Sequence, residues 1–419
     1  MTYQNSNSKD IRHVFILGSK SIGQYGGFET FVSNLIEEHK EEPFIKYHII
    51  CKANGIGYMD ESKLAGIRNV RKDKKGLIYE FTYKNAHVRK LKCPPIGAAV
   101  AVYYDCAALS YCIRYCKKKK ISRPIFYVLA CRIGPFIKHY KNQIKRLGGK
   151  YYLNPDGHEW KRAKWNKMIR CYWKWSERRM VEHSDLVICD SKNIEKYIKD
   201  EYAASKTTFI PYGAETNISK LEDNDTEYIK WMNSKKLDEF KYYLIIGRFV
   251  PENNYETMIR EFMKSHTSKD LVIVTNIDRS SLIELDKKIH FKKDSRIKFV
   301  GTVYNPELLK KIRENAYGYI HGHEVGGTNP SLLEALASTS LNMLLDVSFN
   351  KEVGENAALY WNKNKGDLSR LIDKVDHMSE EERSKYDSMA KKRIKDAYNW
   401  SYIGDEYKRV WFSEGFGDS

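Results

Sequence analysis

The stretch that decides the fold runs from His321 to Leu336 and reads HGHEVGGTNPSLLEAL. A short apolar run ending in Tyr319-Ile320 comes before it, and the sequence Thr-Asn-Pro-Ser, from Thr328, is typical of a helix start. A strand, a glycine loop and a helix start in this order direct backbone N–H groups and the helix dipole at a phosphate. Glu334 lies about one turn inside the helix, where its carboxylate can reach a sugar hydroxyl beside that phosphate. The stretch therefore predicts a phosphate and sugar site, opposite which the rest of the chain builds a second wall.

The length and charge of the chain limit the class of protein it can be. With 419 residues it is long for one core and suits two domains, and 42% hydrophobic residues allow large cores. The 72 Lys and Arg outnumber the 54 Asp and Glu, and the net charge of +18 attracts nucleic acid, an anionic membrane surface or phosphorylated substrates. Because there is no zinc-finger spacing, RNP-like motif or arginine-rich tract, we expect no nucleic-acid partner.

Basic residues cluster in the first half of the chain, at Lys117 to Lys120, Lys138 to Lys150 and Lys161 to Lys167. A solvated lysine-rich surface and attraction to an anionic membrane both explain them. The expected helix from Pro135 to Leu147 has basic residues on one side and apolar ones on the other. An ordinary surface helix is favoured over a membrane-facing one.

The cysteines and the apolar segments indicate a cytoplasmic protein, soluble or peripheral on a membrane. The eight cysteines include no C-x-x-C pair and stand mostly in apolar segments, as buried free thiols of a reducing compartment do. Met1 to Asp10 is polar, so no secretion signal is expected. The most apolar window, Pro94 to Cys116, is interrupted by Asp105 and Arg114 and is no clean membrane span.

A second glycine-rich loop follows the first expected strand, His13 to Leu17, and leads into a helix from Phe28 to His39. The loop matches neither G-x-G-x-x-G nor the Walker pattern, so neither a dinucleotide nor a Walker phosphate site is supported. Gly26 and Gly27 can let a ligand approach the backbone, or they can simply make a bend. Glu29, on the first helical turn, favours a ligand site.

A third polar loop, Asn154 to Arg162, follows the expected strand Tyr151 to Leu153. Open α/β folds bind ligands at the carboxyl ends of their strands. Asp156, His158 and Glu159 are therefore candidate substrate contacts. A turn with solvated charges is the alternative.

In the second half, Arg248 directly follows the expected strand Tyr242 to Ile246. Its planar guanidinium suits two parallel contacts with a pyrophosphate, and a surface salt bridge is the alternative. Val303 and Tyr304 follow another strand end and can hold a base against the backbone. His321 and His323 suggest a metal, but without a third ligand we favour structural histidines near a ligand.

Short apolar runs alternate with helical segments in both halves, so the expected fold class is α/β, with two facing doubly wound, Rossmann-like domains and parallel sheets. We expect an acceptor-binding domain over residues 1–215, a nucleotide-sugar domain over residues 216–395, and a C-terminal helix over residues 396–419 that packs back on the first domain.

The motifs together resemble those of family 4 glycosyltransferases of the GT-B fold, and more closely those of bacterial rhamnosyltransferases that build capsule and cell-wall polysaccharides. The shared segments span nearly the whole chain: Tyr25 to Val32, Asp156 to Arg162, Ile210 to Ala214, Arg248 to Asn254 and Gly322 to Ala335.

Two positions depart from the broad family. Family 4 enzymes commonly carry two glutamates in this loop and helix; the second matches Glu334, but Gly326 stands in place of the first, and Glu324 is displaced by two positions. Many members also have a lysine where this chain has Asn253. The loss of that cation should weaken charge stabilisation of a leaving pyrophosphate, unless another basic residue replaces it.

The resemblance implies a retaining, metal-independent transfer of L-rhamnose from dTDP-β-L-rhamnose, without a further cofactor. The acceptor would be glucose or N-acetylglucosamine on a polyprenyl pyrophosphate, at the anionic inner face of the plasma membrane. The leaving dTDP would help to take the acceptor proton. Another nucleotide sugar, a nucleotide-sugar epimerase and a non-catalytic basic adaptor stay open as alternatives.

The expected site has a donor half and an acceptor half. Donor contacts to the pyrophosphate, the ribose and the base are expected from Arg248, Asn253, Val303, Tyr304, Gly326, Gly327, Thr328, Asn329 and Glu334. The acceptor is expected near Gly26, Gly27 and Glu29. The catalytic candidates are Asp156, His158, Glu29 and Arg248.

Overall fold

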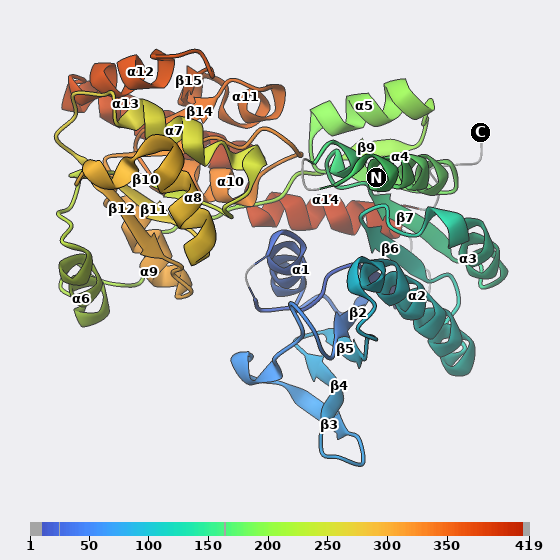
Figure 1. The fold of residues 1–419 in the computed structure, drawn as a ribbon. Coiled ribbons are helices and arrows are strands. Elements are labelled where there is room, and N and C mark those ends of the chain that lie inside the picture. The colour runs from blue at the N-terminus through green and yellow to red at the C-terminus, as the bar shows by residue number, and fades with distance from the viewer. Residues whose placement is uncertain (1–10, 25, 163–164, 414–419) are drawn as a thin grey trace, which may run out of the picture. The chain divides into compact units, whose positions relative to one another are not determined.

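The computed structural model describes residues 11–24, 26–162 and 165–413. The chain divides into two compact units (Figure 1). The first comprises residues 1–160, 165–211 and 400–419, and the second comprises residues 161–164 and 212–399. The chain therefore passes into the second unit after Pro211 and returns to the first at Trp400.

The described part of the first unit contains a nine-stranded sheet with the order β3-β4-β5-β2-β1-β6-β7-β8-β9. Its strands are β1 (Arg12–Leu17), β2 (Ile45–Lys52), β3 (Arg68–Lys72), β4 (Ile78–Tyr83), β5 (Ala86–Leu91), β6 (Ile125–Leu129), β7 (Lys150–Asn154), β8 (Leu186–Cys189) and β9 (Thr207–Phe209).

The first sheet is parallel except at one edge, where β4 runs antiparallel to both β3 and β5. Only Lys84 and Asn85 connect β4 to β5, and a connection this short can join only antiparallel strands. Lys84 has a φ of 52°, in the left-handed region that such tight turns use. The sequence did not predict β3, because all five of its residues are exposed and leave no apolar pattern.

Helices cover both faces of the first sheet: α1 (Gly27–Glu38), α2 (Val100–Lys119), α3 (Gly134–Arg146), α4 (Lys167–Glu182), α5 (Lys192–Tyr202) and α14 (Trp400–Phe412). Successive residues of a strand point to opposite faces. Thus Phe126 of β6 belongs to the core formed with α2 and α3, whereas the hydroxyl of the next residue, Tyr127, lies 3.0 Å from that of Tyr407 on α14.

The C-terminal helix α14 is tied to the first unit by buried polar contacts as well as by packing. Trp411 donates from its indole nitrogen to the hydroxyl of Tyr47 at 3.0 Å. The ring of His39 lies 3.0 Å from the carbonyl oxygen of Gly404. A side chain on Gly404 would come within 2.4 Å of Glu38, so a glycine is needed where α14 crosses α1.

In the second unit the described residues form a parallel sheet with the order β12-β11-β10-β13-β14-β15. The strands are β10 (Tyr242–Ile246), β11 (Asp270–Val274), β12 (Ile297–Gly301), β13 (Gly318–His321), β14 (Asn342–Leu345) and β15 (Leu359–Trp361). The helices are α6 (Thr226–Lys235), α7 (Tyr255–Phe262), α8 (Arg279–Ile289), α9 (Pro306–Glu314), α10 (Pro330–Ser338), α11 (Ser348–Gly354), α12 (Asp367–Asp376) and α13 (Glu380–Ala397).

Both faces of the second sheet are buried. Along β10, Tyr243 and Ile245 pack into the core on one face, and Tyr242, Leu244 and Ile246 pack into the core on the other. A parallel strand covered by helices on both sides is apolar at every position, which is why its sequence is a continuous apolar run. The prediction of two doubly wound α/β domains is confirmed.

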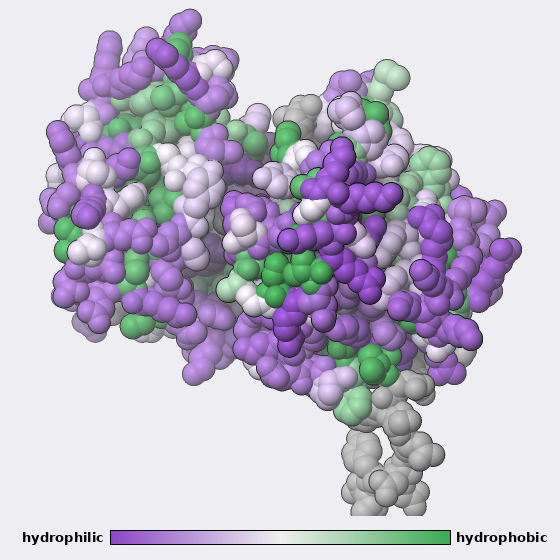
Figure 2. All heavy atoms as spheres, turned by 90° about the horizontal axis from the view of Figure 1, so that it is seen from below, coloured by the Kyte–Doolittle hydropathy of each residue, from purple (hydrophilic) through white to green (hydrophobic). Residues whose placement is uncertain are grey.

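No helix among the described residues is both long and apolar enough to span a bilayer. On the face of the molecule drawn in Figure 2, hydrophilic side chains predominate and hydrophobic ones gather in small groups.

Candidate active site

The second sheet has one position where the winding direction reverses. Strands β10 and β13 are neighbours, but the chain leaves β10 for β11 on one side and leaves β13 for β14 on the other. Open α/β sheets bind ligands outside the carboxyl ends of their strands at such a switch point. The loop of residues 247–254 follows β10, and the loop of residues 322–329 follows β13. Both predicted phosphate loops therefore lie at the switch point.

Three contacts hold these two loops together. The amide of Glu324 donates to the carbonyl of Glu252 at 3.0 Å, and the side-chain amide of Asn254 donates to the carbonyl of Gly322 at 2.8 Å. The Nδ1 of His323 lies 2.7 Å from the Oδ1 of Asn253. A side chain on Gly322 would come within 2.6 Å of the backbone of the other loop, so this glycine allows the close approach.

Arg248 places an unpaired cation at the switch point. It is exposed, and its guanidinium makes no hydrogen bond or ion pair with any residue that the structure describes. Its backbone carbonyl is anchored, because it accepts a hydrogen bond from the side-chain amide of Asn253 at 2.8 Å. The charge of Arg248 acts on the ring of His323, so the guanidinium lies near that ring. A fixed backbone with an unpaired guanidinium suits a bound anion.

The two histidines of the opening stretch are neutral at neutral pH. Burial, together with the positive charges of Arg162 and Arg248, lowers the pKa of His323 to about 4. Burial, with a contribution from His323, lowers the pKa of His321 to about 3. The Nε2 of His321 is buried without a hydrogen-bond partner among the described residues. Neither ring brings a positive charge to the site.

Acidification should destabilise the folded chain through His321. A histidine has a pKa of about 6.5 in an unfolded chain and about 3 at this buried position. Between these values the unfolded state binds more protons, so stability falls as the pH drops below about 6.5. We expect a loss of about 3 kcal/mol at pH 4 from this group. Urea unfolding at several pH values checks it: His321→Phe should show a flatter pH dependence, and an unchanged slope would contradict the assignment.

The loop before α10 offers backbone donors, whereas the helix start itself is already capped. The N–H groups of Gly326 and Gly327 donate to no described residue. Gly326 has a φ of 145°, a conformation that favours glycine. By contrast, the Oδ1 of Asn329 accepts from the amides of Ser331 at 2.9 Å and Leu332 at 3.4 Å. An anion at this position would meet the loop amides rather than the first amides of the helix.

The two acidic side chains of the opening stretch have different partners. Glu334 on α10 forms an ion pair with Arg313 on α9; the glutamate side chain is 32% exposed and the arginine side chain only 4%. Glu324 forms an ion pair with Lys363. The carboxylate of Glu334 thus neutralises a buried cation, in addition to any contact it makes with a ligand.

Val303 and Tyr304 also follow the carboxyl end of a strand, but one farther from the switch point. They follow β12, the edge strand, which β11 separates from β10. Tyr304 is 83% exposed, and Val303 packs against the core. No described hydrogen bond or ring contact joins either residue to the loops at the switch point.

The first sheet has its own switch point, between β1 and β6. The loop after β1 contains Gly18, whose φ is 103° and whose added side chain would come within 2.3 Å of the backbone of Leu129. Glu29 on α1 is held to this loop, because its Oε1 accepts from the amide of Lys20 at 2.9 Å. A side chain on Gly26 would collide with Glu29, whereas one on Gly27 would meet nothing within 4 Å. The space beside Gly27 is open to a ligand.

Arg132, which was not predicted from the sequence, lies at this switch point three residues after the end of β6. Its Nη1 donates to the Oδ2 of Asp105 at 3.0 Å and to the carbonyl of Leu129 at 3.2 Å. Asp105 is fully buried on α2. An available signal was the position of Arg132 shortly after a strand, which is similar to that of Arg248 in the second unit.

Asp156 and His158 follow β7, the strand next to β6. Asp156 has a φ of 62°, which is uncommon outside glycine, and its amide donates to the Oδ1 of Asn154 at 2.8 Å. Its charge acts on Arg132, so the two residues lie near each other. The ring of His158 lies 4.3 Å from that of Tyr197. No described contact joins Glu29 to Asp156 or His158. Among the described residues, no group of three or more His, Cys, Asp or Glu is arranged to hold a metal ion.

Comparisons with known proteins identify the fold. Residues 11–215 match a family model described as a domain of unknown function, DUF1972. Comparison with curated proteins finds no significant match. Among solved structures, sucrose-phosphate synthase from Thermosynechococcus elongatus has a TM-score of 0.72 at 14% identity, covering 96% of this chain and 98% of the other.

Two further solved structures resemble the whole chain. A glycosyltransferase from Rickettsia africae has a TM-score of 0.69 at 12% identity, covering 96% of this chain and 98% of its own. HepE from Anabaena, in complex with UDP and glucose, has a TM-score of 0.68 at 11% identity, covering 96% and 99%. The chain therefore has the GT-B fold, with two Rossmann-like units.

Proposed function

We propose that this chain is a retaining glycosyltransferase that moves L-rhamnose from dTDP-β-L-rhamnose to glucose or N-acetylglucosamine on a polyprenyl pyrophosphate. The observation that carries the transferase proposal is the switch point of the second unit. There the unpaired guanidinium of Arg248 stands by two loops, one of which presents the unbonded amides of Gly326 and Gly327. The resemblance to rhamnosyltransferases supports the choice of sugar, and the GT-B structure solved with UDP and glucose supports a nucleotide sugar as donor.

The donor pyrophosphate is held by charge and by backbone donors. Arg248 binds its oxygens in a bidentate manner, and the amides of Gly326 and Gly327, with Thr328 and Asn329 beside them, contact the phosphate next to the sugar. Glu334 accepts from the ribose hydroxyls, and Val303 with Tyr304 holds the base. Asn253, where many relatives of family 4 have a lysine, orients the loop through the Arg248 carbonyl and His323.

The reaction breaks the bond between the anomeric carbon and the diphosphate oxygen and forms one from that carbon to the acceptor oxygen. Negative charge develops on the leaving dTDP, and preorganised donors stabilise it. His323 is neutral and brings no positive charge to this side of the site, whereas Arg248 does. The acceptor proton passes to the leaving diphosphate, so the proposed transfer uses neither a metal nor a further cofactor.

The first unit supplies the acceptor half in this proposal. In this proposal Gly26 and Gly27 line the space that the acceptor sugar occupies, and Glu29, Asp156 and His158 contact and orient the acceptor. The ion pair between Arg132 and Asp105 holds the loops that follow β1 and β6 in place. Basic side chains of this unit draw the protein to the anionic inner face of the plasma membrane, where a polyprenyl acceptor resides.

A transfer assay that crosses several nucleotide sugars with synthetic lipid-pyrophosphate sugars tests this function. We expect product from dTDP-β-L-rhamnose with one of the two acceptors, and none when the acceptor is omitted. Transfer from another nucleotide sugar alone would replace rhamnose in the proposal. An epimer formed from donor alone would assign an isomerase instead. Thermal stabilisation by an oligonucleotide but not by dTDP would indicate a binding protein.

A further inference from the structure

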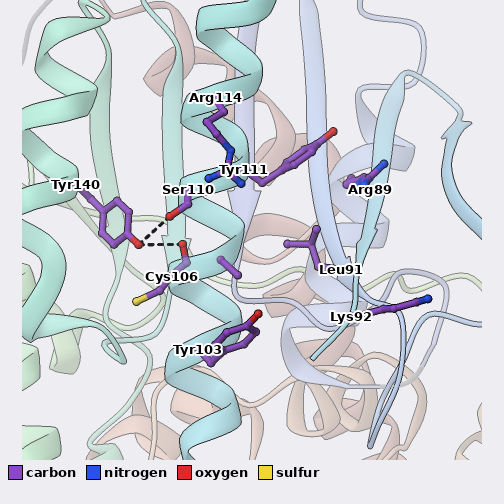
Figure 3. Close-up of a pocket in the computed structure, with 10 residues that line it drawn as sticks. Arg89, Leu91, Lys92, Tyr103, Cys106, Ser110, Tyr111, Arg114 and Tyr140 are labelled. Carbon is purple, nitrogen blue, oxygen red and sulfur yellow. Dashed lines mark hydrogen bonds between the residues drawn. The ribbon is translucent and has the colours of Figure 1, made fainter. Parts of the chain in front are cut away.

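A cavity of the first unit lies outside both switch points. It has a volume of about 510 Å³ and runs along the outward face of α2 (Figure 3). Tyr103, Ser110, Tyr111 and Arg114 lie along this helix face, Tyr140 of α3 lies on one side, and Arg89, Leu91 and Lys92 lie on the other. None of the residues predicted for the donor or the acceptor lines it.

The side chains that line this cavity include three cations and no carboxylate. Arg114 is exposed and makes no hydrogen bond or ion pair with a described residue. Lys92 forms an ion pair with Asp73 at 3.5 Å. Arg89 donates from Nη1 to Glu80 at 3.3 Å, whereas its Nε has no partner. The cavity therefore has more positive charge than its protein partners neutralise.

Aromatic rings fix one of these cations and line the cavity. The guanidinium of Arg89 lies 4.4 Å from the ring centre of Tyr79 and 5.1 Å from that of Tyr111, so the rings hold it in place. The hydroxyl of Tyr140 donates to the carbonyl of Cys106 at 3.0 Å and lies 3.0 Å from the Oγ of Ser110, so these hydroxyls are held in place beside the cavity (Figure 3). Tyr103 is 44% exposed at the open end and presents a ring on which a ligand can pack.

We propose that this cavity binds a phosphate ester whose non-phosphate part packs on Tyr103. The lining residues include three cations and no carboxylate, which suits an anionic phosphate, and guanidinium groups are suited to its oxygens. A bare phosphate would leave most of the volume empty, since cavities of this size hold small organic ligands. The ester is either the headgroup of an anionic lipid or a soluble phosphorylated metabolite, and both have the same chemistry.

Two binding measurements on the full-length chain separate these sources. Sedimentation with phosphatidylcholine vesicles, with and without phosphatidylglycerol, reports a lipid headgroup. Calorimetry with glycerol 3-phosphate reports a soluble ester. The double variant Arg114→Ala/Lys92→Ala removes two cavity cations that no buried contact fixes. The matched control Lys118→Ala/Lys119→Ala removes the same charge from the exposed end of α2, outside the cavity.

The cavity variant should bind at least one probe about tenfold more weakly than the native chain, and the control should bind within about twofold of it. If the cavity variant loses affinity for the vesicles alone, the ligand is a lipid headgroup. If it loses affinity for glycerol 3-phosphate, the ligand is a soluble ester. Equal losses in both variants, or no binding of either probe, would overturn the proposal. The stabilisation of both variants by dTDP should equal that of the native chain, so this result is independent of the donor site.

Discussion

Replacing Arg248 by alanine is expected to lower sugar transfer on the order of 100-fold or more while leaving the folded structure unchanged. The guanidinium makes no hydrogen bond or ion pair with a described residue, so its removal leaves no buried group without a partner. In the proposed complex it contacts and helps to neutralise the departing diphosphate, and the neighbouring His323 is neutral and does not replace it. This substitution should therefore lower the transfer activity without lowering the stability of the fold.

The measurement is kcat/KM for transfer, together with thermal unfolding with and without dTDP. Arg260→Ala is the matched control: this arginine on α7 is also exposed and is paired only with Glu256 along its own helix, so its loss should change transfer less than about twofold. Arg248→Lys should recover part of the activity, since it restores the charge but not the bidentate fork. Near-normal turnover of Arg248→Ala would contradict the placement of the pyrophosphate.

The second large effect concerns Glu334, where a structural and a binding role must be separated. Glu334→Gln leaves the guanidinium of Arg313 buried without a counter-ion. Breaking a buried pair from one side costs about 3–5 kcal/mol. Arg313→Met removes the buried charge itself, and the partly exposed Glu334 then stays hydrated. We therefore expect Glu334→Gln to be the more destabilising of the two single substitutions.

The double variant Glu334→Gln/Arg313→Met distinguishes the roles of Glu334. With both charges removed, urea unfolding should return to within about 1 kcal/mol of the native stability, because no buried charge is left without a partner and the partly exposed position 334 stays hydrated. Affinity for dTDP, measured by calorimetry, should stay weak if the carboxylate binds the ribose. Recovery of dTDP affinity along with stability would show that Glu334 acts only as the partner of Arg313.

The fold class was predictable because it rests on local patterns. Each strand of the second unit is covered on both faces, so it must be apolar throughout, and the run at residues 242–246 is an example. The polar loops directly after such runs were recognised because loop composition, like the apolar run of a buried strand, is a local property of the sequence. The short edge strand β3 was not recognised, because an exposed strand needs no apolar residue and is held by its hydrogen-bond partners alone.

The site was predictable only in part. The loop of Arg248 and the loop of Gly326 were each recognised from a strand end and its polar residues. The sequence also suggested free amides at the start of α10, but the side chain of Asn329 caps two of them. Arg132 was not predicted, because its partner Asp105 was noted only as a charge that interrupts an apolar window. The contact between these two residues, which are 27 positions apart in the sequence, depends on packing.

By itself, the sequence determined the alternation of strands and helices and the polar loops after the strands, because periodic burial and loop composition are local properties. Only the tertiary structure decided which loops become neighbours. Strand β10 pairs with β13 through backbone hydrogen bonds that every residue type except proline can make, so no side chain specifies the pairing locally. The order of the strands therefore makes Arg248 and Asn253 neighbours of the stretch at His321 to Leu336. The packing of α9 against α10 brings Glu334 to its buried partner Arg313.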